Sequence, residues 1–358
     1  MSGYFSSEEL SSLLEIKEKI YEGQDLPLIL DACDKAGKLK CDFPLLYATV
    51  LLATHGRREQ AFSIYNSGKL KDPFADEFFR YLKKNGSVEP KVVVFKSSLP
   101  YDAWVKTNLF KIELENTLKT IGTFFETIYE DCESVNILDI GPGNGKMTAQ
   151  IINHILSKRK VKRVNLVLLD KFPAMLEAAK KFCEETINAE VKVETICCPA
   201  QSLREENIAK LKSFAPFWTT ICSRSIHHMP STLKLELLKK LKNLTKSLLL
   251  VEMNSTHDLP EKDSPDLIYS ITRSYGFIFN DINNSPLTQE EKLASIDDFL
   301  LAEALFMIGK ERADRIDYHA TEEEWRNLAV KAGFKIAVTE PSAVYPDGEA
   351  HYFTMIMK

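Results

Sequence analysis

Hydrophobic positions in the second half of the chain alternate between the period of a strand and the period of a helix. Val135–Ile140 is an apolar run with β-branched residues, which predicts a buried strand. Lys146–Lys158 follows, with neither glycine nor proline and with apolar residues at helical spacing. Further apolar runs predict strands at 164–169, 191–197, 219–222 and 247–253. Strands that alternate with helices predict an α/β fold with a parallel sheet.

The last part of the chain adds a helix and two more strands. Thr321 and the acids after it resemble a capping box, and Gly333 marks the end of that helix. Strands are predicted at 335–340 and 351–357. The stretch 255–318 is longer than an ordinary connection and predicts a helical insertion with two helices, placed over the substrate side of the sheet.

Residues 1–90 form a separate helical pattern. Their segment 44–65 resembles one helix–turn–helix of the tetratricopeptide type, but such repeats need about three units to bury a continuous core. A helical bundle that packs on the catalytic domain or mediates a homodimer is therefore favoured over a peptide-binding groove. Residues 91–130 are predicted to be lid or connecting helices, with one long helix from about 100 to 129, and 131–358 to be the catalytic domain.

Three of the chain's 14 glycines, Gly141, Gly143 and Gly145, lie within five residues between the first strand and its helix. Glycine permits positive φ and close approach of a ligand to the backbone, where free N–H groups of the helix start are exposed. The dinucleotide fingerprint is G-x-G-x-x-G, whereas Lys146 stands here at the position of its third glycine. Asp139, two residues before the first glycine, suits a ligand with a cationic amine better than a pyrophosphate. A nicotinamide-dependent oxidoreductase is therefore disfavoured.

The stretch D-I-G-P-G-N-G at 139–145 resembles the first motif of class I S-adenosylmethionine-dependent methyltransferases. The resemblance covers about 135–358 and implies a Rossmann-like sheet of seven strands with the last one antiparallel. It also implies that the glycine loop binds the methionine part of S-adenosylmethionine, with S-adenosylhomocysteine as the product. The stretch 250–334, with its W-x-x-L-x-x-x-A-G-F ending, also resembles the GRAS family. That family shares the fold; its plant members act mainly in regulatory protein complexes, and bacterial relatives are thought to be methyltransferases.

The resemblance implies several further cofactor contacts. Asp170 ends the second strand, where an acid accepts hydrogen bonds from a ribose diol. Lys171 and Phe172 follow it, and Phe172 occupies the family position that packs on adenine. The residue after the fourth strand's last cysteine, Ser223, is a fourth candidate.

Two positions depart from the family pattern. Pro199 stands where the family has the acid that holds the adenine amine, so Gln201 or backbone groups are the candidates for this contact. Trp218 stands where an acid usually precedes the fourth strand.

The candidate catalytic residues are Glu252, His227 and Tyr101, which could orient or deprotonate a substrate. A His pair such as His227 and His228 can also bind metal, but no carboxylate stands at i+4 from either, so no metal site is predicted. In the family this pair mostly packs beneath the site, and that structural role is favoured. The candidate substrate contacts are Trp104, His228, Asn254, Tyr275 and Asp281.

Composition adds constraints on partners and compartment. The chain has 358 residues and a net charge of −5, which gives no general attraction to nucleic acid or to anionic membranes. No secretory signal is visible at the N-terminus, and no apolar run approaches the ~20 residues of a membrane helix. Seven cysteines without a C-x-x-C are typical of a reduced, cytoplasmic protein.

Two hypotheses follow from the sequence. The first is a methyltransferase that uses S-adenosylmethionine and acts on oxygen or nitrogen of a small molecule, with a peptide or protein acceptor left open. The second is a GRAS-like regulatory or protein-interaction module that binds the cofactor without turnover.

Overall fold

The computed structural model describes residues 4–37, 42–89, 91, 93, 97–128, 131–257 and 259–358. The chain forms two compact units. The sheet unit comprises Val94–Ser255 and Ile316–Lys358, and the helical unit comprises Met1–Val93 and Thr256–Arg315. The inserted segment thus belongs to the same compact unit as the N-terminal helices. The predicted domain boundaries at 90 and 130 remain predictions.

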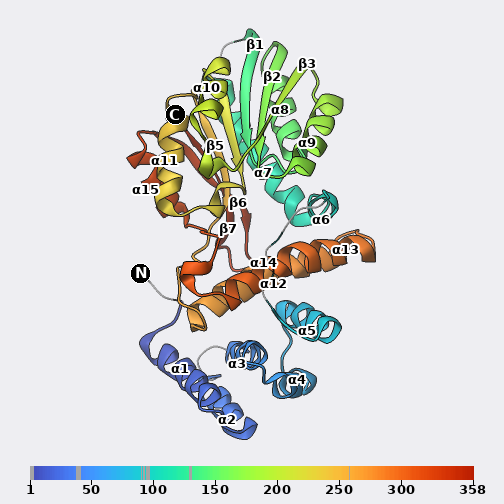
Figure 1. Cartoon of the computed structure of the whole chain (residues 1–358), viewed down its shortest axis with the longest axis vertical. Helices are drawn as coiled ribbons and strands as arrows, with labels where there is room; N and C mark the ends of the chain where they lie inside the picture. The colour runs from blue at the N-terminus through green and yellow to red at the C-terminus, as the bar shows by residue number, and fades with distance from the viewer. Residues whose placement is uncertain are drawn as a thin grey trace. The chain divides into compact units, whose positions relative to one another are not determined.

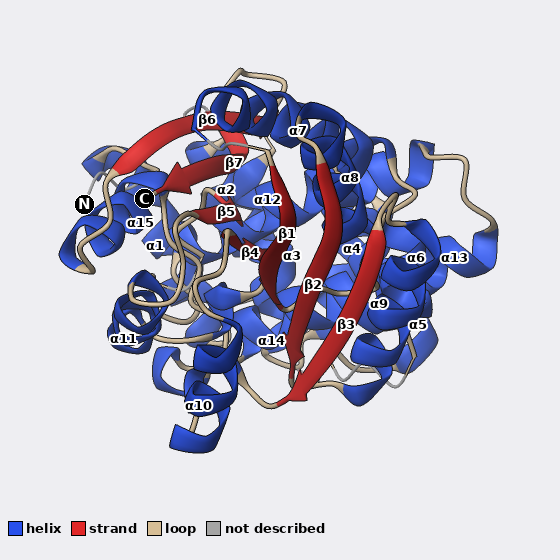
Figure 2. Cartoon of the chain, turned by 90° about the horizontal axis from the view of Figure 1, so that it is seen from above, coloured by secondary structure: helices blue, strands red, loops and turns tan. Residues whose placement is uncertain are grey.

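The sheet unit contains the predicted seven-stranded sheet, with strand order β3-β2-β1-β4-β5-β7-β6 (Figures 1 and 2). Strands β1 to β5 pair in parallel, and β7 is antiparallel to both of its neighbours. This arrangement confirms the predicted fold class. The strands are β1 Cys132–Ile140, β2 Val161–Asp170, β3 Glu190–Cys197, β4 Thr219–Ser223, β5 Leu248–Met253, β6 Ile336–Val344 and β7 Ala350–Met357.

Helices cover both faces of this sheet, which explains why every residue of β4 and β5 is buried. One face carries α7 (Asn108–Ile128), α8 (Lys146–Lys158) and α9 (Pro173–Thr186), as Figure 2 shows. The other face carries α10, α11 and α15, which are Glu205–Phe214, Ser231–Lys242 and Glu322–Lys331. The core on this second face includes Leu138, Val167, Phe217, Leu238, Leu250, Trp325 and Phe353.

The prediction of one continuous helix from about 100 to 129 is wrong, because the structure divides this stretch into two helices. The structure has α6 at Leu99–Trp104 and α7 from Asn108 onward. Thr107 separates them: its hydroxyl accepts a hydrogen bond from the backbone N–H of Phe110 at 3.2 Å. A threonine that caps the first turn of a helix in this way favours a new start at that point.

The helical unit consists of the N-terminal helices and the inserted segment. Helix α12 packs against α5 and α3. Gly276 of α12 lies against Phe74, and the rings of Phe74 and Phe279 stack with centroids 5.9 Å apart. The helices are α1 Ser7–Tyr21, α2 Leu26–Ala36, α3 Phe43–Thr54, α4 Arg58–Asn66, α5 Pro73–Asn85, α12 Pro265–Asn284, α13 Gln289–Ser295 and α14 Leu301–Gly309, with a π-helical turn at Ile296–Leu300 before α14.

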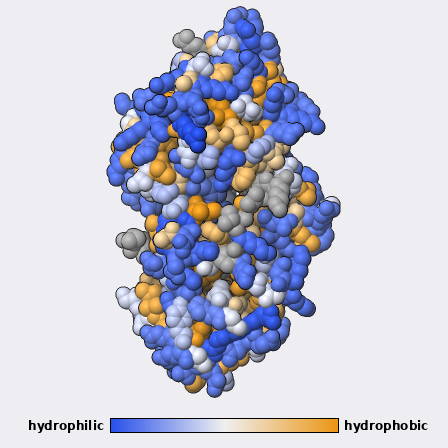
Figure 3. Space-filling view, in the orientation of Figure 1, coloured by the Kyte–Doolittle hydropathy of each residue, from blue (hydrophilic) through white to orange (hydrophobic). Residues whose placement is uncertain are grey.

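The surface of each unit on the face shown in Figure 3 is mostly hydrophilic. The exposed large hydrophobic residues of the described chain are dispersed along the sequence, for example Leu28, Ile112 and Val330. Among the described helices, none combines the length and the hydropathy needed to cross a membrane.

Candidate functional site

The glycine loop connects β1 to α8 and has the backbone that its sequence requires. Gly141, Gly143 and Gly145 have φ values of 69°, 58° and 79°, in the left-handed region. A Cβ added at Gly141 would lie 2.3 Å from the Cβ of Ser225, and one at Gly143 would lie 2.6 Å from the ring of Tyr101. At Gly145 it would lie 2.8 Å from the carbonyl oxygen of Ala179. Each glycine is therefore needed both for its conformation and for the closeness of its neighbours.

The loop lies where open α/β sheets bind ligands. Strand β1 has β2 on one side and β4 on the other, so the order of the strands reverses at β1. Ligands bind outside the carboxyl ends of the strands at such a switch point. The residues at the ends of the two flanking strands, Asp170 and Ser223, therefore lie on either side of the loop.

Asp139 is buried beneath the loop, with 2% of its surface exposed. Its Oδ2 accepts a hydrogen bond from Thr148 Oγ1 at 2.5 Å, whereas Oδ1 is buried and has no hydrogen-bond partner among the described residues. Burial raises the pKa of this carboxyl to about 7, with a further contribution from Asp170 and an opposing one from the Thr148 hydrogen bond. A buried polar oxygen without a partner costs free energy unless a ligand satisfies it.

Asp170 is partly exposed at the end of β2. Its Oδ1 accepts a hydrogen bond from the backbone N–H of Phe172 at 2.8 Å, and burial raises its pKa. Lys171 is exposed, and its Nζ lies 4.9 Å from the centroid of the Phe172 ring. Gln201 lies in a short 3₁₀ turn, Ala200–Ser202, and is exposed. The structure thus places these four predicted residues at the carboxyl ends of β2 and β3.

Helix α6 lies directly on the glycine loop. Asn144 Nδ2 donates to Asp102 Oδ1 at 2.7 Å, and Lys146 Nζ donates to the carbonyl of Val105 at 3.1 Å. The ring of Tyr101 contacts the loop at Gly143. The predicted pocket residue Tyr101 is therefore beside the loop, whereas Trp104 on the same helix is buried.

Ser223 is buried, and its hydroxyl lies 2.9 Å from the sulfur of Met147. The sequence reasoning missed its neighbour Arg224, whose guanidinium is paired with Glu113 at 3.0 Å. The position of Arg224, a cation directly after a buried strand, could have indicated that it belongs to the site. Its partner on α7 was not predictable, since 111 positions separate the two residues.

Two histidine–carboxylate pairs lie side by side after β4. His227 Nδ1 is 2.9 Å from Glu252 Oε2, and His228 Nδ1 is 2.5 Å from Asp317 Oδ1. The two imidazole centroids are 4.1 Å apart. Burial, and then His228, lower the pKa of His227, although Glu252 opposes this shift. Burial alone would raise the pKa of Asp317, but the hydrogen bond from His228 holds it below its usual value.

Glu252 and Asn254, at the end of β5, make hydrogen bonds that shape the surrounding loops. Glu252 Oε1 accepts from the backbone N–H groups of Ser225 and Ile226, at 3.2 and 3.3 Å. Asn254 donates from Nδ2 to the carbonyl of Ala350 and accepts through Oδ1 from the N–H of Glu322. These contacts favour a positioning role for both side chains.

The other two predicted substrate contacts belong to the helical unit. Tyr275 is buried, and its hydroxyl donates to Glu303 Oε2 at 2.8 Å. The carbonyl of Asp281 accepts from the hydroxyl of Ser285 at 2.8 Å. Both interactions lie within the insertion.

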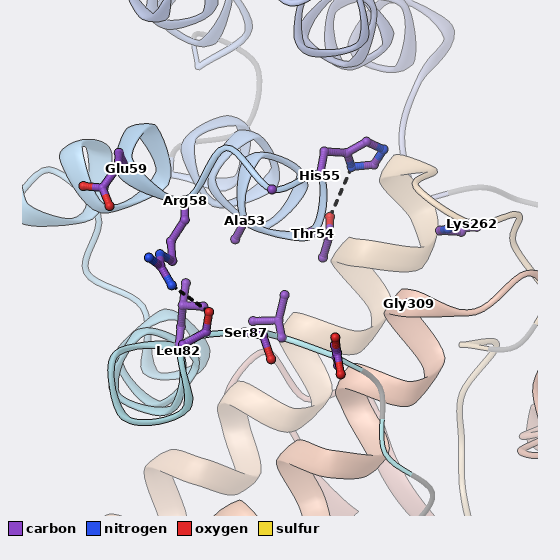
Figure 4. Close-up of a pocket in the computed structure, with 13 residues that line it drawn as sticks. Ala53, Thr54, His55, Arg58, Glu59, Leu82, Ser87, Lys262 and Gly309 are labelled. Atoms are coloured by element: carbon purple, nitrogen blue, oxygen red, sulfur yellow. Dashed lines mark hydrogen bonds between the residues drawn. The ribbon is translucent and has the colours of Figure 1, made fainter.

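The helical unit also contains a cavity of about 600 Å³ (Figure 4). It lies between the end of α3, the start of α4 and the end of α5, and Lys262 and Gly309 also line it. Arg58 donates from Nη1 to the carbonyl of Gly86 at 2.6 Å, and His55 Nδ1 lies 3.4 Å from Thr54 Oγ1. None of the predicted site residues is among the described residues that line this cavity.

Comparisons with known proteins agree with this architecture at the level of the fold. No family model and no curated protein matches the sequence. SCL7 of Oryza sativa, a GRAS protein, is similar in structure over 99% of this chain and 100% of its own, with a TM-score of 0.61 and 13% identity. Magnesium protoporphyrin IX methyltransferase from Synechocystis PCC 6803, solved with bound S-adenosylhomocysteine, covers 79% of this chain and 91% of its own at a TM-score of 0.39 and 13% identity. The chain has the fold of class I S-adenosylmethionine-dependent methyltransferases.

Proposed function

We propose that this protein is an S-adenosylmethionine-dependent methyltransferase that acts on oxygen or nitrogen of a small molecule. One observation carries the proposal: the left-handed G-x-G-x-G loop covers a buried carboxylate with an unpartnered oxygen, Asp139 Oδ1, at the switch point of the sheet. A dinucleotide has no ammonium group to satisfy that oxygen, whereas S-adenosylmethionine carries one.

The residues of this chain fit the cofactor. Asp139 would supply the acceptor for an ammonium group, and the glycine loop that covers it would bind the amino-acid part. Asp170, at the neighbouring strand end, would bind the ribose diol, and Phe172 would pack on one face of the adenine. The bound cofactor supplies a methyl group on an electrophilic sulfonium centre.

The chain's own contribution to the reaction is to orient the acceptor, to exclude water and to take up a proton. His228 is the residue that we assign to the proton. Its Nδ1 bonds the carboxylate of Asp317, whose lowered pKa keeps it ionised, so the basic nitrogen of this imidazole is Nε2. The side chain of His228 is 35% exposed, compared with 10% for His227. Glu252 then acts as a positioning residue, which changes the role that the sequence suggested for it.

Titration calorimetry with S-adenosylhomocysteine, and with NAD in parallel, tests the cofactor assignment. We expect binding of S-adenosylhomocysteine alone, and a loss of at least tenfold in affinity for Asp170→Ala. Glu133→Gln is the matched control, because Glu133 is an exposed acid near the start of β1, away from the strand ends that carry Asp170. Binding of NAD, or of neither ligand by the folded protein, would refute the proposal.

The second candidate is a regulatory module that binds the cofactor without turnover. The likeness to SCL7 over the whole chain, helical unit included, favours it. Methylation of any acceptor by the purified protein, detected as formation of S-adenosylhomocysteine, would eliminate this candidate. Cofactor binding together with a mapped protein partner and no turnover would support it.

A further inference from the structure

Arg224 occupies an unusual position at the end of β4. It follows Ser223, the last residue of the strand, and its φ of 50° is in the left-handed region. Only one other non-glycine residue of the described chain, Asp263, has a positive φ. Strained backbone of this kind concentrates at functional sites, where the surrounding structure holds a side chain in a required place.

The guanidinium of Arg224 is enclosed by aromatic rings. Its Cζ lies 4.9 Å from the centroid of Phe110, 5.7 Å from that of Trp104 and 5.8 Å from that of Tyr352. Only 9% of the side chain is exposed. The faces of these rings stabilise a cation.

The ion pair with Glu113 leaves hydrogen-bonding capacity unused on both sides. Arg224 Nη1 is 3.0 Å from Glu113 Oε2, yet Nε and Nη1 of Arg224 make no hydrogen bond to the described residues. Both oxygens of Glu113 are likewise buried without a hydrogen bond there. Buried guanidinium donors normally satisfy their hydrogen bonds, so Nε, which lies outside the ion pair, is left for an anionic ligand.

The guanidinium also lies at the glycine loop. Arg224 Nη2 is 3.4 Å from the hydroxyl of Tyr101, whose ring contacts Gly143, and 4.0 Å from the sulfur of Met147 in the first turn of α8. The guanidinium of Arg224 thus belongs to the same site as Asp139.

The strand order fixes the direction of a bound cofactor. Strands β2 and β4 flank β1, and neighbouring strands are about 4.8 Å apart, so the ends of β2 and β4 lie about 10 Å apart. If Asp170 holds the ribose at the end of β2, the amino-acid group would extend across the glycine loop toward β4. Arg224 is the cation at the end of that strand.

We propose that Arg224 binds the α-carboxylate of the cofactor's amino-acid group through the Nε side of its guanidinium, and that Glu113 and the aromatic rings hold the guanidinium in place. This inference rests on the proposed function. It adds a charged anchor that discriminates the intact amino acid from analogues that lack the carboxylate.

The test combines a change in the ligand with a change in the protein. Calorimetry compares S-adenosylhomocysteine with its decarboxylated analogue, which keeps the adenosine, the thioether and the amine. We expect the wild-type protein to bind the complete ligand at least tenfold more tightly. In Arg224→Gln the two ligands should bind with about equal affinity, because the substitution weakens only the binding of the ligand that carries the carboxylate.

Two further variants keep the result interpretable. Arg224→Lys retains the charge but not the planar fork, and we expect it to keep part of the preference even if Arg224→Gln fails to fold. Arg163→Gln is the matched control, since this exposed arginine lies near the start of β2, away from the strand ends that carry the site, and should leave the preference unchanged.

The outcomes are distinguishable. A wild-type preference that is absent, or that survives in Arg224→Gln, would refute the carboxylate assignment while leaving the proposed function intact. An equal loss for both ligands would also refute it and would assign Arg224 to the fold of the site. Folded protein that binds neither ligand would refute the proposed function itself.

Discussion

The ring of Tyr101 lies so close to Gly143 that a Cβ on this glycine would be 2.6 Å from Cε1 of the tyrosine. Helix α6 is held in that position by the bond from Asn144 to Asp102, so the ring is not free to withdraw. The packing of α6 on the glycine loop therefore depends on the absence of a side chain at residue 143.

Gly143→Ala should destabilise the sheet unit more than an ordinary left-handed glycine would. The positive φ alone costs about 1–2 kcal/mol, and displacement of the Tyr101 ring should add about as much again. Gly333→Ala is the control, because Gly333 has φ of 91° but its added Cβ would meet none of the described atoms within 4 Å. Urea unfolding of both variants, and of Gly143→Ala combined with Tyr101→Ala, measures the difference. The packing argument would be contradicted if Gly143→Ala and Gly333→Ala lowered the free energy of unfolding equally. It would also be contradicted if Tyr101→Ala did not reduce the loss caused by Gly143→Ala in the double variant.

Much of this arrangement was predictable because it is local in the sequence. Apolar runs located the strands of the sheet, and the spacing of Gly141, Gly143 and Gly145 located the loop. The partner of His228 was not predictable, because Asp317 lies 89 positions away and approaches only in the folded chain. A pattern of carboxylates at i+4 does not reveal a partner that is so distant in the sequence.

The same limit applies to the organisation of the chain. The sequence shows a helical N-terminal region and a long insertion, but nothing local indicates that they form one compact unit. That grouping depends on side chains such as Phe74 and Phe279, which are more than 200 positions apart. Likewise, Thr107 divides α6 from α7 through a single capping bond within an otherwise helical pattern.

Asp139→Asn should stabilise the protein at alkaline pH. Burial raises the pKa of Asp139 to about 7, above its usual 3.8, so the folded state binds a proton more tightly than the unfolded state. Wild-type stability therefore falls as pH rises from about 4 through 7, and the uncharged amide removes that loss. We expect Asp139→Asn to exceed the wild type by about 2–4 kcal/mol at pH 8 and by little at pH 4.5. Urea unfolding at pH 8 and pH 4.5 measures this difference, and Glu133→Gln is the control with an exposed acid on the same strand. If Asp139→Asn were less stable than the wild type at pH 8, the prediction would be contradicted.

The same substitution should abolish cofactor binding, because its oxygen is the proposed acceptor for the ammonium group. Asp139→Asn would then be more stable at pH 8 and yet bind S-adenosylhomocysteine at least tenfold more weakly. Calorimetry at pH 8 on the folded variant measures the second effect. Unchanged affinity would show that the buried carboxylate belongs to the fold and not to the cofactor site.

Asp317 should behave in the opposite way. The bond from His228 holds the pKa of Asp317 below its usual value, so the pair adds stability above pH 4 that is lost as the pH falls through the folded pKa. We expect Asp317→Asn to cost about 1–3 kcal/mol at pH 7, with the cost shrinking below pH 4. A double-mutant cycle with His228→Gln, measured by urea unfolding at both pH values, isolates the interaction. A coupling free energy that is independent of pH would show that the charge of Asp317 does not carry it.

In the helical unit, Arg80 of α5 should be required to join the N-terminal helices to the insertion. Its Nη1 lies 3.1 Å from Asp297 Oδ2, a second contact joins Nη2 to Oδ1, and the carboxylate of Asp297 is only 6% exposed. Because removing one partner leaves a buried charge poorly compensated, we expect Arg80→Ala to cost about 2–4 kcal/mol. Lys84 still contacts Asp297 at 3.2 Å, which keeps the loss below that of a fully isolated pair.

The matched control is Lys35→Ala, which breaks the exposed i,i+4 pair with Asp31 on α2 and should leave unfolding unchanged. Circular dichroism during urea unfolding measures both variants. Arg80→Ala combined with Asp297→Asn should recover part of the loss, because the charge of Asp297 is removed while the carboxylate of Glu77, which also pairs with Arg80, remains. If Arg80→Ala were as stable as Lys35→Ala, the ion pair would not join the two segments. In that case packing such as that of Phe74 against α12 would carry the connection, and Phe74→Ala would be the variant that weakens the contact between the insertion and the N-terminal helices.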